Sequence, residues 1–434
     1  MFQTLRNAWK IPDLRKKILF SLFIILIFRI GSAISVPFVE METIRDAVSS
    51  NTGGFMDYLT LMSGGGFSNA SIFALSITPY INASIIIQLL TVAIPPLERM
   101  AKDGEAGRKK LGQITRYVTV ALGLMLGVAY YFMVKNKYHA LTYTSGGWAW
   151  FAGIVIVLCF TAGSALMMWL GEQINEKGIG NGISIILFAG IVSRMPTTLY
   201  SLYSYMDKGG AYYALAPIAF VSLILMIGFI VWMDNAERRI PVQYAKRVVG
   251  RKMYGGQNTH IPIKVNMCGV LPIIFASSIL SLPPTIQMFV TVKEGGFWAG
   301  FFKIFETTHW AYGIMYFVLI IFFAYFYAAI QYNPIEMANN IRKNSGAIPG
   351  IRPGKPTSDY ITKILSRLTL LGALLLSVVA LFPLLFSQIT GAFHHQVNLS
   401  LGGTSIIIMV GVALETVKQL ESQMMMRHYK GFLD

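Results

Sequence analysis

Residues 72–94, IFALSITPYINASIIIQLLTVAI, form an apolar stretch that is long enough to cross a lipid bilayer as one helix. Two features distinguish it from a plain membrane-spanning helix: it contains Pro79, and it follows a run of small residues, SGGG, at 63–66. Proline interrupts the hydrogen-bond ladder of a helix interior, and glycine allows the chain to bend. We therefore predict a spanning segment that is preceded by a break in the chain.

The same apolar character extends along all 434 residues. Hydrophobic residues make up 54% of the chain and charged residues only 13%, with a mean hydropathy of +0.56, whereas about a quarter of a soluble domain is charged. We therefore expect an all-α polytopic membrane protein. Ten apolar segments are candidate transmembrane helices: 18–38, 72–94, 116–135, 150–170, 181–195, 213–233, 266–290, 309–331, 367–390 and 403–419.

Basic residues are distributed unequally between the two ends of these segments. Of the 36 Lys and Arg residues, 28 fall on the side of the membrane that holds the N-terminus, seven fall on the other side, and Arg29 lies inside the first span. Cytoplasmic loops carry an excess of Lys and Arg, so both termini are expected in the cytoplasm. The net charge of +16 then indicates contact with anionic lipids and no specific recognition of nucleic-acid sequences.

Two of the inner loops, 234–265 and 332–367, are longer than a simple connection requires. In the first, apolar and polar residues alternate on both sides of Gly250 and of Gly255-Gly256, which predicts a β-hairpin with a basic tip. We expect both loops to be docking sites for a cytoplasmic partner. The alternative is that their basic residues serve only topology and lipid contact.

Two short motifs occur twice. Residues 79–86 and 272–279 share Pro-x-Ile-x-Ala-Ser-x-Ile, and residues 182–190 and 403–411 share Gly-x-Ser-Ile-Ile-[Leu/Ile]-x-x-Gly. Each copy lies five spans from its counterpart. Because five is odd, the second half must enter from the opposite face, and we predict two inverted five-helix halves around a central pore.

These boundaries divide the chain into four parts. They are an N-terminus at 1–17, an N-terminal half at 18–200, a C-terminal half at 213–419 and a tail at 420–434. We expect residues 1–17 to form an amphipathic helix on the membrane surface, the alternative being a frayed basic tail.

The duplicated segments are rich in branched aliphatic residues, and the span interiors contain few carboxylates. Intramembrane carboxylates mark ion and proton relays, so their scarcity disfavours the alternative function, an inverted-repeat secondary transporter of a small solute. We expect the aliphatic residues to form a narrow constriction that excludes water and ions, the alternative for each being ordinary helix packing. The candidates are Ile77, Ile81, Ile183, Leu187, Ile274 and Ile408.

Three smaller features have local interpretations. Asn181 should cap and bend the helix that follows it. Gly123 and Gly127, four residues apart, predict a close helix contact. Arg29, inside the first span, is expected to reach toward the interface or to pair with a neighbour.

Motifs for catalysis and cofactor binding are not found. Residues 350–356, GIRPGKP, lack the spacing and the Ser or Thr of a phosphate-binding loop. The two cysteines, Cys159 and Cys268, lie in apolar segments without the spacing of a metal site. We therefore expect no enzyme activity, no cofactor and no metal.

The chain resembles the SecY family, the channel-forming subunits of the general protein translocase, over essentially its full length. The resemblance is carried by ALSITPYINASIIIQLL in the second span, MWLGEQINEKGIGNGISII between the fourth and fifth spans, AKRVVGRKMYGGQNTHIPIKVN in the hairpin loop, GAIPGIRPGKPT, and GGTSIIIMV. It implies that the six aliphatic residues form the pore ring. Leu187 departs from the isoleucine that is commonest in the family at its position.

The resemblance also implies two moving parts. Spans 2 and 3 would face spans 7 and 8 to form a lateral gate to lipid. A plug at about 55–67 would close the outer funnel. Its residues and hinge would be Phe55, Met56, Asp57, Tyr58, Leu59, Leu61, Met62, Gly64, Gly65 and Gly66.

The implied cargo is unfolded secretory polypeptide and membrane protein precursors, driven across a bacterial plasma membrane by the SecA ATPase or the translating ribosome. SecE and SecG would be partner subunits. The residues that would contact SecA or the ribosome are Arg251, Lys252, Arg342 and Arg352.

Overall fold

Helices dominate the computed structural model of the chain. The structure describes residues 6, 8–50, 60, 62–143, 146–207, 212–244, 247–249, 252–254, 258–287, 296–306, 309–392 and 403–430. The N-terminal half contains α2 (Pro12–Ala33), α3 (Met41–Ser50), α5 (Thr78–Ala93), α6 (Pro95–Lys102), α7 (Gly104–Met133), the π-helical turn η1 (Val134–Tyr138), α8 (Gly147–Lys177) and α9 (Gly182–Asp207).

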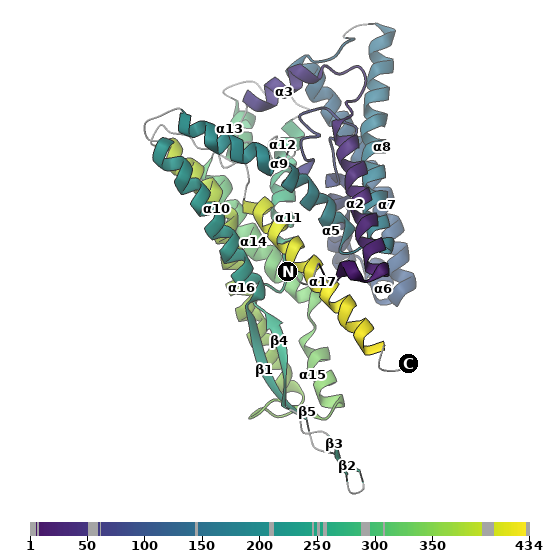
Figure 1. The fold of residues 1–434 in the computed structure, drawn as a ribbon, viewed down its shortest axis with the longest axis vertical. Helices are drawn as coiled ribbons and strands as arrows, with labels where there is room; N and C mark the ends of the chain where they lie inside the picture. The colour runs from purple at the N-terminus through teal and green to yellow at the C-terminus, as the bar shows by residue number, and fades with distance from the viewer. Residues whose placement is uncertain are drawn as a thin grey trace.

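The C-terminal half is built in the same way. It contains α10 (Tyr212–Asn235), α11 (Leu271–Leu280), α12 (Leu282–Gln287), α13 (Phe297–Ile304), α14 (Trp310–Gln331), α15 (Pro334–Lys343), α16 (Lys355–Ala392) and α17 (Gly403–Lys430). Figure 1 shows the helices α2, α7 and α8 of the first half on one side, and α10, α14 and α16 of the second on the other. The last helix, α17, runs obliquely between the two groups.

Each of the ten predicted spans overlaps a helix. In the described part of the chain, seven helices are long and apolar enough to cross a membrane (α7, α8, α9, α10, α14, α16 and α17), and α5 with α6 gives an eighth if that pair, bent by 103°, is one span. The remaining two predicted spans, 18–38 and 266–290, contain helices that are not both long and apolar enough. Helix α2 carries charged residues that include Lys16, Lys17 and Arg29, and α11 with α12 is too short. Their apolar sequences fit the remaining two positions of the ten-span arrangement.

The second span begins later than its hydropathy predicts. Residues 72–77 form turns, with Ser76 at a positive φ of 51°, and α5 starts at Thr78. The reason is Pro79, which occupies the first turn of α5, where a missing N–H removes no helical hydrogen bond. The predicted break in the chain therefore extends six residues into the expected helix.

Between the first two predicted spans, Met41–Ser50 forms α3, a helix that was not predicted from the sequence. Ile44 of α3 is fully buried in a cluster with Phe67, Tyr130 and Phe160. Packing of Ile44 on these aromatic side chains stabilises α3. The mainly polar sequence of this helix does not indicate that one of its residues is buried in the core.

Each half is assembled around its own helix contacts. In the first half, α5 packs on α7 and α7 packs on α8; in the second, α11 packs on α14 and α14 packs on α16. Helices α9, α10 and α17 contact one another and so join the halves. Within the described residues, α5 and α7 make no extensive contact with α11 or α14.

A small sheet projects from one end of the helical body. Strand β1 (Glu237–Tyr244) pairs antiparallel with β4 (Asn258–Lys264), which confirms the predicted hairpin, and β2 (Arg247–Val249) pairs with β3 (Lys252–Tyr254). Strand β5 (Gly346–Ala347), which was not predicted, comes from the other long loop and adds to the free edge of β1. The two loops therefore form one unit.

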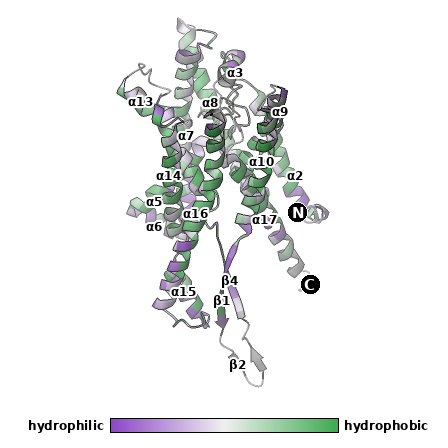
Figure 2. Cartoon of the chain, turned by 90° about the vertical axis from the view of Figure 1, so that its left-hand side faces the viewer, coloured by the Kyte–Doolittle hydropathy of each residue, from purple (hydrophilic) through white to green (hydrophobic). Residues whose placement is uncertain are grey.

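This unit, the sheet module, has a core of its own that contains Ile240, Val242, Ile341 and Ile361. Figure 2 shows hydrophilic residues concentrated in α15, β1 and β4, whereas the long helices are mainly hydrophobic. The sheet module is thus a polar body at one end of the mainly hydrophobic long helices.

Candidate pore constriction

The six candidate pore residues come from four separated parts of the chain. Ile77 precedes α5 and Ile81 lies in its first turn; Ile183 and Leu187 lie one turn apart in α9; Ile274 belongs to α11 and Ile408 to α17. All six belong to one continuous hydrophobic cluster. The same hydrophobic core therefore contains residues that are up to 331 positions apart, from Ile77 to Ile408.

Within this cluster, Ile77, Leu187 and Ile408 are buried, with exposures of 0%, 3% and 3%. The other three are half-buried. A Cβ placed on Gly171 of α8 would lie 3.6 Å from Cδ1 of Ile77 and 3.5 Å from Cγ1 of Ile183. The side chains of Ile77 and Ile183 therefore approach the same point on α8.

The duplicated motifs occupy equivalent places in the fold. Pro79 and Pro272 are each the second residue of a helix, α5 and α11. Gly182 and Gly403 each begin a helix, α9 and α17. This correspondence gives the two sequence repeats a shared structural role.

The two initial glycines are required by close backbone contact. A Cβ on Gly182 would overlap the carbonyl oxygen of Gly171, and a Cβ on Gly403 would overlap that of Val379. The start of α9 thus lies against α8 as the start of α17 lies against α16. Asn181 accepts hydrogen bonds from the N–H groups of Ile183 and Ser184, at 3.1 and 3.4 Å, which confirms the predicted cap.

The glycine break lies directly against α9. Gly64 and Gly65 have φ values of +62° and +92°, a conformation that favours glycine. A Cβ on Gly64 would lie 3.1 Å from Cα of Gly190, the last glycine of the repeated motif. The segment therefore turns sharply where two glycine backbones meet.

Side chains from other parts of the first half hold this turn. Arg29 of α2 donates a hydrogen bond of 3.0 Å to the carbonyl of Gly64, so the predicted pairing of Arg29 with a neighbour is confirmed. Ser76 donates to the carbonyl of Met62 at 3.1 Å, and Tyr130 of α7 donates to the carbonyl of Phe67 at 2.9 Å. Sequence reasoning missed all three acceptors, because a main-chain carbonyl leaves no mark in a sequence.

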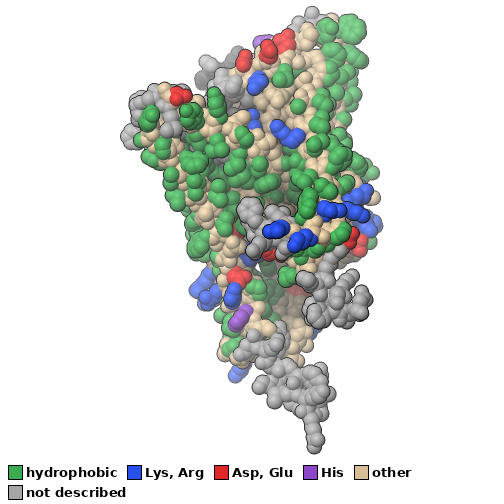
Figure 3. Space-filling model, in the orientation of Figure 1, with side chains coloured by type: hydrophobic (Ala, Val, Ile, Leu, Met, Phe, Trp, Pro, Cys, Tyr) green, Lys and Arg blue, Asp and Glu red, His purple; other side chains and the backbone are tan. Residues whose placement is uncertain are grey.

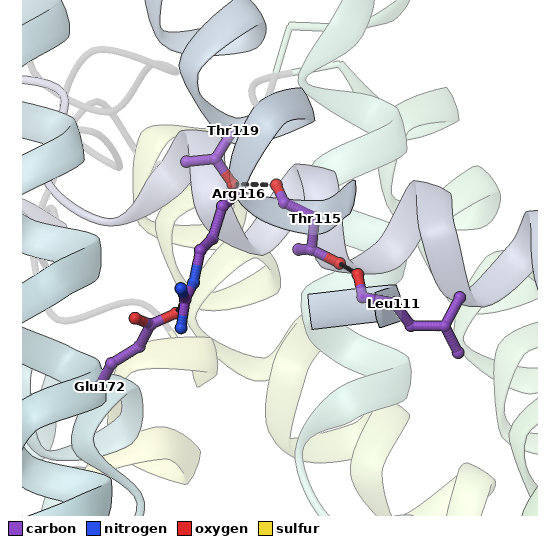
Figure 4. A network of polar contacts seen from close by, with 5 residues as sticks. All are labelled: Leu111, Thr115, Arg116, Thr119 and Glu172. Atoms are coloured by element: carbon purple, nitrogen blue, oxygen red, sulfur yellow. Dashed lines mark hydrogen bonds and ion pairs between the residues drawn. The ribbon is translucent and has the colours of Figure 1, made fainter. Parts of the chain in front are cut away.

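The contact between α7 and α8 combines small residues and one ion pair. A Cβ on Gly123 would lie 2.8 Å from Oγ of Ser164, so the predicted close approach at Gly123 is confirmed. Arg116 of α7 donates through Nε to Oε1 of Glu172 on α8 at 2.8 Å (Figure 4). The figure also shows Thr115 and Thr119 bonded to carbonyls one turn earlier in α7, which satisfies their hydroxyls within the helix.

The predicted docking residues lie at the polar end. Arg342 lies in the last turn of α15 and Arg352 lies in the following loop, and both are exposed. Lys252 begins β3, at the tip of the hairpin. In Figure 3 most Lys and Arg side chains lie below the band of hydrophobic surface, on the side of the sheet module.

Several predicted residues fall outside the described part of the chain. Met62, Gly64, Gly65 and Gly66 of the plug and hinge are described, and Gly66 lies in the same turn. The remaining plug and docking candidates, Phe55, Met56, Asp57, Tyr58, Leu59, Leu61 and Arg251, lie outside the described residues.

The fold and the apolar cluster together define a class: a polytopic α-helical membrane protein with two pseudo-equivalent halves. The SecY family model matches residues 71–417. The chain is 43% identical to the protein translocase subunit SecY of Streptomyces coelicolor over 442 residues, and 42% identical to that of Mycobacterium bovis over 447 residues, covering 100% of each protein. The chain therefore belongs to the SecY family.

Solved structures show the same fold. One described as the structure of a protein conducting channel matches with a TM-score of 0.61 and 17% identity, covering 94% of this chain and 92% of the other. Sec61 in a canine ribosome-channel complex from the endoplasmic reticulum matches with a TM-score of 0.59 and 14% identity, covering the same shares of the two chains. Membership of this family makes the chain a subunit of a protein-conducting channel.

Proposed function

We propose that this chain is the central subunit of a bacterial translocase, which passes unfolded secretory polypeptides across the plasma membrane and releases membrane segments into lipid. The observation that supports the proposal is that one hydrophobic core takes side chains from both copies of each duplicated motif; the six candidates in it are Ile77, Ile81, Ile183, Leu187, Ile274 and Ile408. Such a position between two inverted halves is where a permeation path is expected.

The chemistry of the six side chains suits a variable substrate. Aliphatic groups form no fixed hydrogen bonds, so they can surround a passing side chain of any polarity without selecting for it. When no chain is present, a narrow apolar ring excludes water and ions by dewetting. The same ring can therefore tolerate many substrates and still preserve the membrane barrier.

A route to lipid is supported by the pattern of helix contacts. Helices α5 and α7 pack together, as do α11 and α14, but extensive contact between the two pairs is not seen among the described residues. The boundary between the pair α5 and α7 and the pair α11 and α14 is here called the seam. Separating the two pairs along it would break few packing contacts. We assign the seam as the lateral gate.

The sheet module is the proposed docking site for a driving partner in the cytoplasm, either SecA or the ribosome. Two long loops supply one body that carries Lys252, Arg342 and Arg352. A canine relative of this fold is a ribosome-bound channel, which supports the ribosome as one such partner. SecE, SecG and anionic lipids complete the proposed assembly.

Crosslinking from the constriction tests the function. Cysteines are placed at Ile81 and Ile274 in a chain whose Cys159 and Cys268 are replaced by alanine, and a secretory precursor is stalled during export. We expect both positions to crosslink to the precursor. A cysteine at Leu225, which is 67% exposed on α10, is the matched control and should not crosslink.

The same experiment separates the proposal from the transporter alternative. Uptake of a small solute by purified protein, without crosslinking from Ile81 or Ile274, would overturn the channel assignment. Crosslinking from both positions without solute uptake would eliminate the transporter.

A further inference from the structure

Helix α13 presents an aromatic face that plays no part in the proposed function. Its sequence, FWAGFFKI, is rich in aromatic residues. At about 3.6 residues per turn, Phe297, Trp298 and Phe301 lie on one face of the helix. Lys303 lies on the opposite face. The helix is therefore amphipathic, with its cation on the side away from the aromatic rings.

The described part of the protein leaves this aromatic face open. The side chains of Phe297 and Trp298 are 84% and 62% exposed, whereas Phe302, at the edge of the face, is 7% exposed. Helix α13 packs on α12 and α14, so Phe302 marks the side of the helix that faces the protein. The rings of Trp298 and Phe301 meet edge to face with their centroids 6.1 Å apart. The exposed rings therefore form one continuous apolar surface, and such surfaces mark interaction sites.

A stripe on the next helix indicates what covers this surface. In α14, the exposed side chains at every fourth residue are Trp310, Ile314, Val318 and Phe322. Helix α14 is long and apolar enough to cross a membrane, and apolar side chains that such a helix exposes are expected to contact acyl chains. Trp310 is the first residue of α14, the helix on which α13 packs. The aromatic face of α13 thus continues a lipid-facing surface at the end of a span.

The position and composition of α13 fit the boundary between acyl chains and water. Both views show α13 at the end of the long helices that is remote from the sheet module (Figures 1 and 2). Tryptophan is enriched at this boundary, because its indole ring combines an apolar body with one N–H donor. Helices with aromatic residues on one face and lysine on the other lie in the plane of the membrane interface. A lipid surface therefore accounts for both faces of α13, whereas a protein partner would account for the aromatic face alone.

We propose that α13 is an interfacial anchor, which inserts Phe297, Trp298 and Phe301 into the headgroup region of the leaflet remote from the sheet module. Lys303, on the opposite face, stays in water. Because α13 packs on both α12 and α14, the anchor fixes the depth of the seventh and eighth predicted spans at this surface. These two spans form one side of the seam, so the anchor holds that side at a constant level in the membrane. The contact depends on the lipid alone, and its failure would leave the proposed function intact.

Spin labels on single cysteines test this contact in the full chain, purified with its partner subunits and placed in vesicles of phosphatidylethanolamine and phosphatidylglycerol. Cys159 and Cys268 are replaced by alanine, and a nitroxide is attached at Phe297→Cys or at Lys303→Cys. Oxygen concentrates among acyl chains and a nickel chelate stays in water, so the ratio of their collision rates reports what surrounds each label. We expect the ratio of oxygen to nickel collisions to be several-fold higher at Phe297→Cys than at Lys303→Cys.

Two further labels calibrate the ratio: Val318→Cys on the exposed stripe of α14 for acyl chains, and His260→Cys on β4 for water. An equal ratio at both positions of α13, whether water-like or lipid-like, would overturn the anchor. Few collisions with either reagent at Phe297→Cys would show that a partner protein or a second copy of the chain covers the face, and would also overturn it. Trp298→Cys repeats the measurement on the same face, so that a local disturbance at Phe297 does not decide the outcome.

Discussion

At the scale of single residues, the packing of the apolar cluster depends on how closely backbones approach one another. Helices α8 and α9 are in contact where a Cβ on Gly182 would overlap the carbonyl oxygen of Gly171, and the side chains of Ile77 and Ile183 approach Gly171 at this contact. The turn at Gly64 and Gly65 is similarly close to α9, because a Cβ on Gly64 would lie 3.1 Å from Cα of Gly190. Small residues thus determine the distances, and large ones fill the space that remains.

Gly64→Ala should therefore be destabilising for two reasons. The left-handed conformation costs an ordinary residue about 1–2 kcal/mol, and the new Cβ would lie 3.1 Å from Cα of Gly190. Gly104→Ala is the matched control, because Gly104 has a φ of +71° with nothing within 4 Å. We expect a lower apparent unfolding temperature for G64A than for G104A at one scan rate. Equal temperatures would show that the contact with Gly190 contributes nothing.

Sequence reasoning reached the aliphatic residues but not their surroundings. Ile77 and Ile274 were found because each lies in or beside a motif that occurs twice, and repetition is visible in a sequence. Arg29 was recognised as unusual, yet its acceptor could not be named, because any carbonyl within reach would have served. The contact with Gly64 depends on how α2 and the glycine turn pack, which no local pattern records.

At the scale of elements, hydropathy located every span but not every boundary. The period and length of the apolar runs were sufficient for α7, α8 and α10, which are helical throughout the predicted ranges. They failed at residues 72–77, where Pro79 sets the start of α5, and at α3, where tertiary packing around Ile44 stabilises a helix of polar sequence. Strand β5 was missed because two residues are too few to show an alternating pattern.

The sheet module gives a prediction at this scale. Arg352 follows the segment that supplies β5, and the local turn is held by Thr357, whose hydroxyl donates to the backbone carbonyl of Arg352 at 2.9 Å. The side chain is exposed and has no part in that bond. Arg352→Glu should therefore preserve the fold and reduce SecA-driven export by at least about tenfold, since like charges juxtaposed at an interface cost several kcal/mol.

Export assays on membrane vesicles measure this effect. Lys355→Glu, an exposed charge reversal three residues further along the chain, is the control. Equal losses in both variants would mean that the general charge of the loop matters and that Arg352 has no particular role.

At the scale of the whole molecule, charge and hydropathy have separate locations. The sheet module and most basic residues lie at one end of the helical body, and α13 lies at the other (Figures 1 and 3). Of the 36 Lys and Arg residues, 28 fall in segments on the side of the N-terminus. The positive-inside rule therefore predicts that the sheet module and both termini lie in the cytoplasm.

This orientation is tested by labelling single cysteines in intact cells with a membrane-impermeant maleimide. His260 of β4 and Glu306 beyond α13 are both exposed, and replacing either by cysteine leaves the count of Lys and Arg unchanged. With Cys159 and Cys268 replaced by alanine, Glu306→Cys should be labelled from outside, whereas His260→Cys should be labelled only after the membrane is opened. We expect this result because the orientation is set by the many basic side chains that would otherwise have to cross the bilayer. A single cysteine substitution does not change their number. Labelling of His260→Cys in intact cells would reverse the assigned orientation and place the proposed docking residues on the wrong side for a cytoplasmic motor.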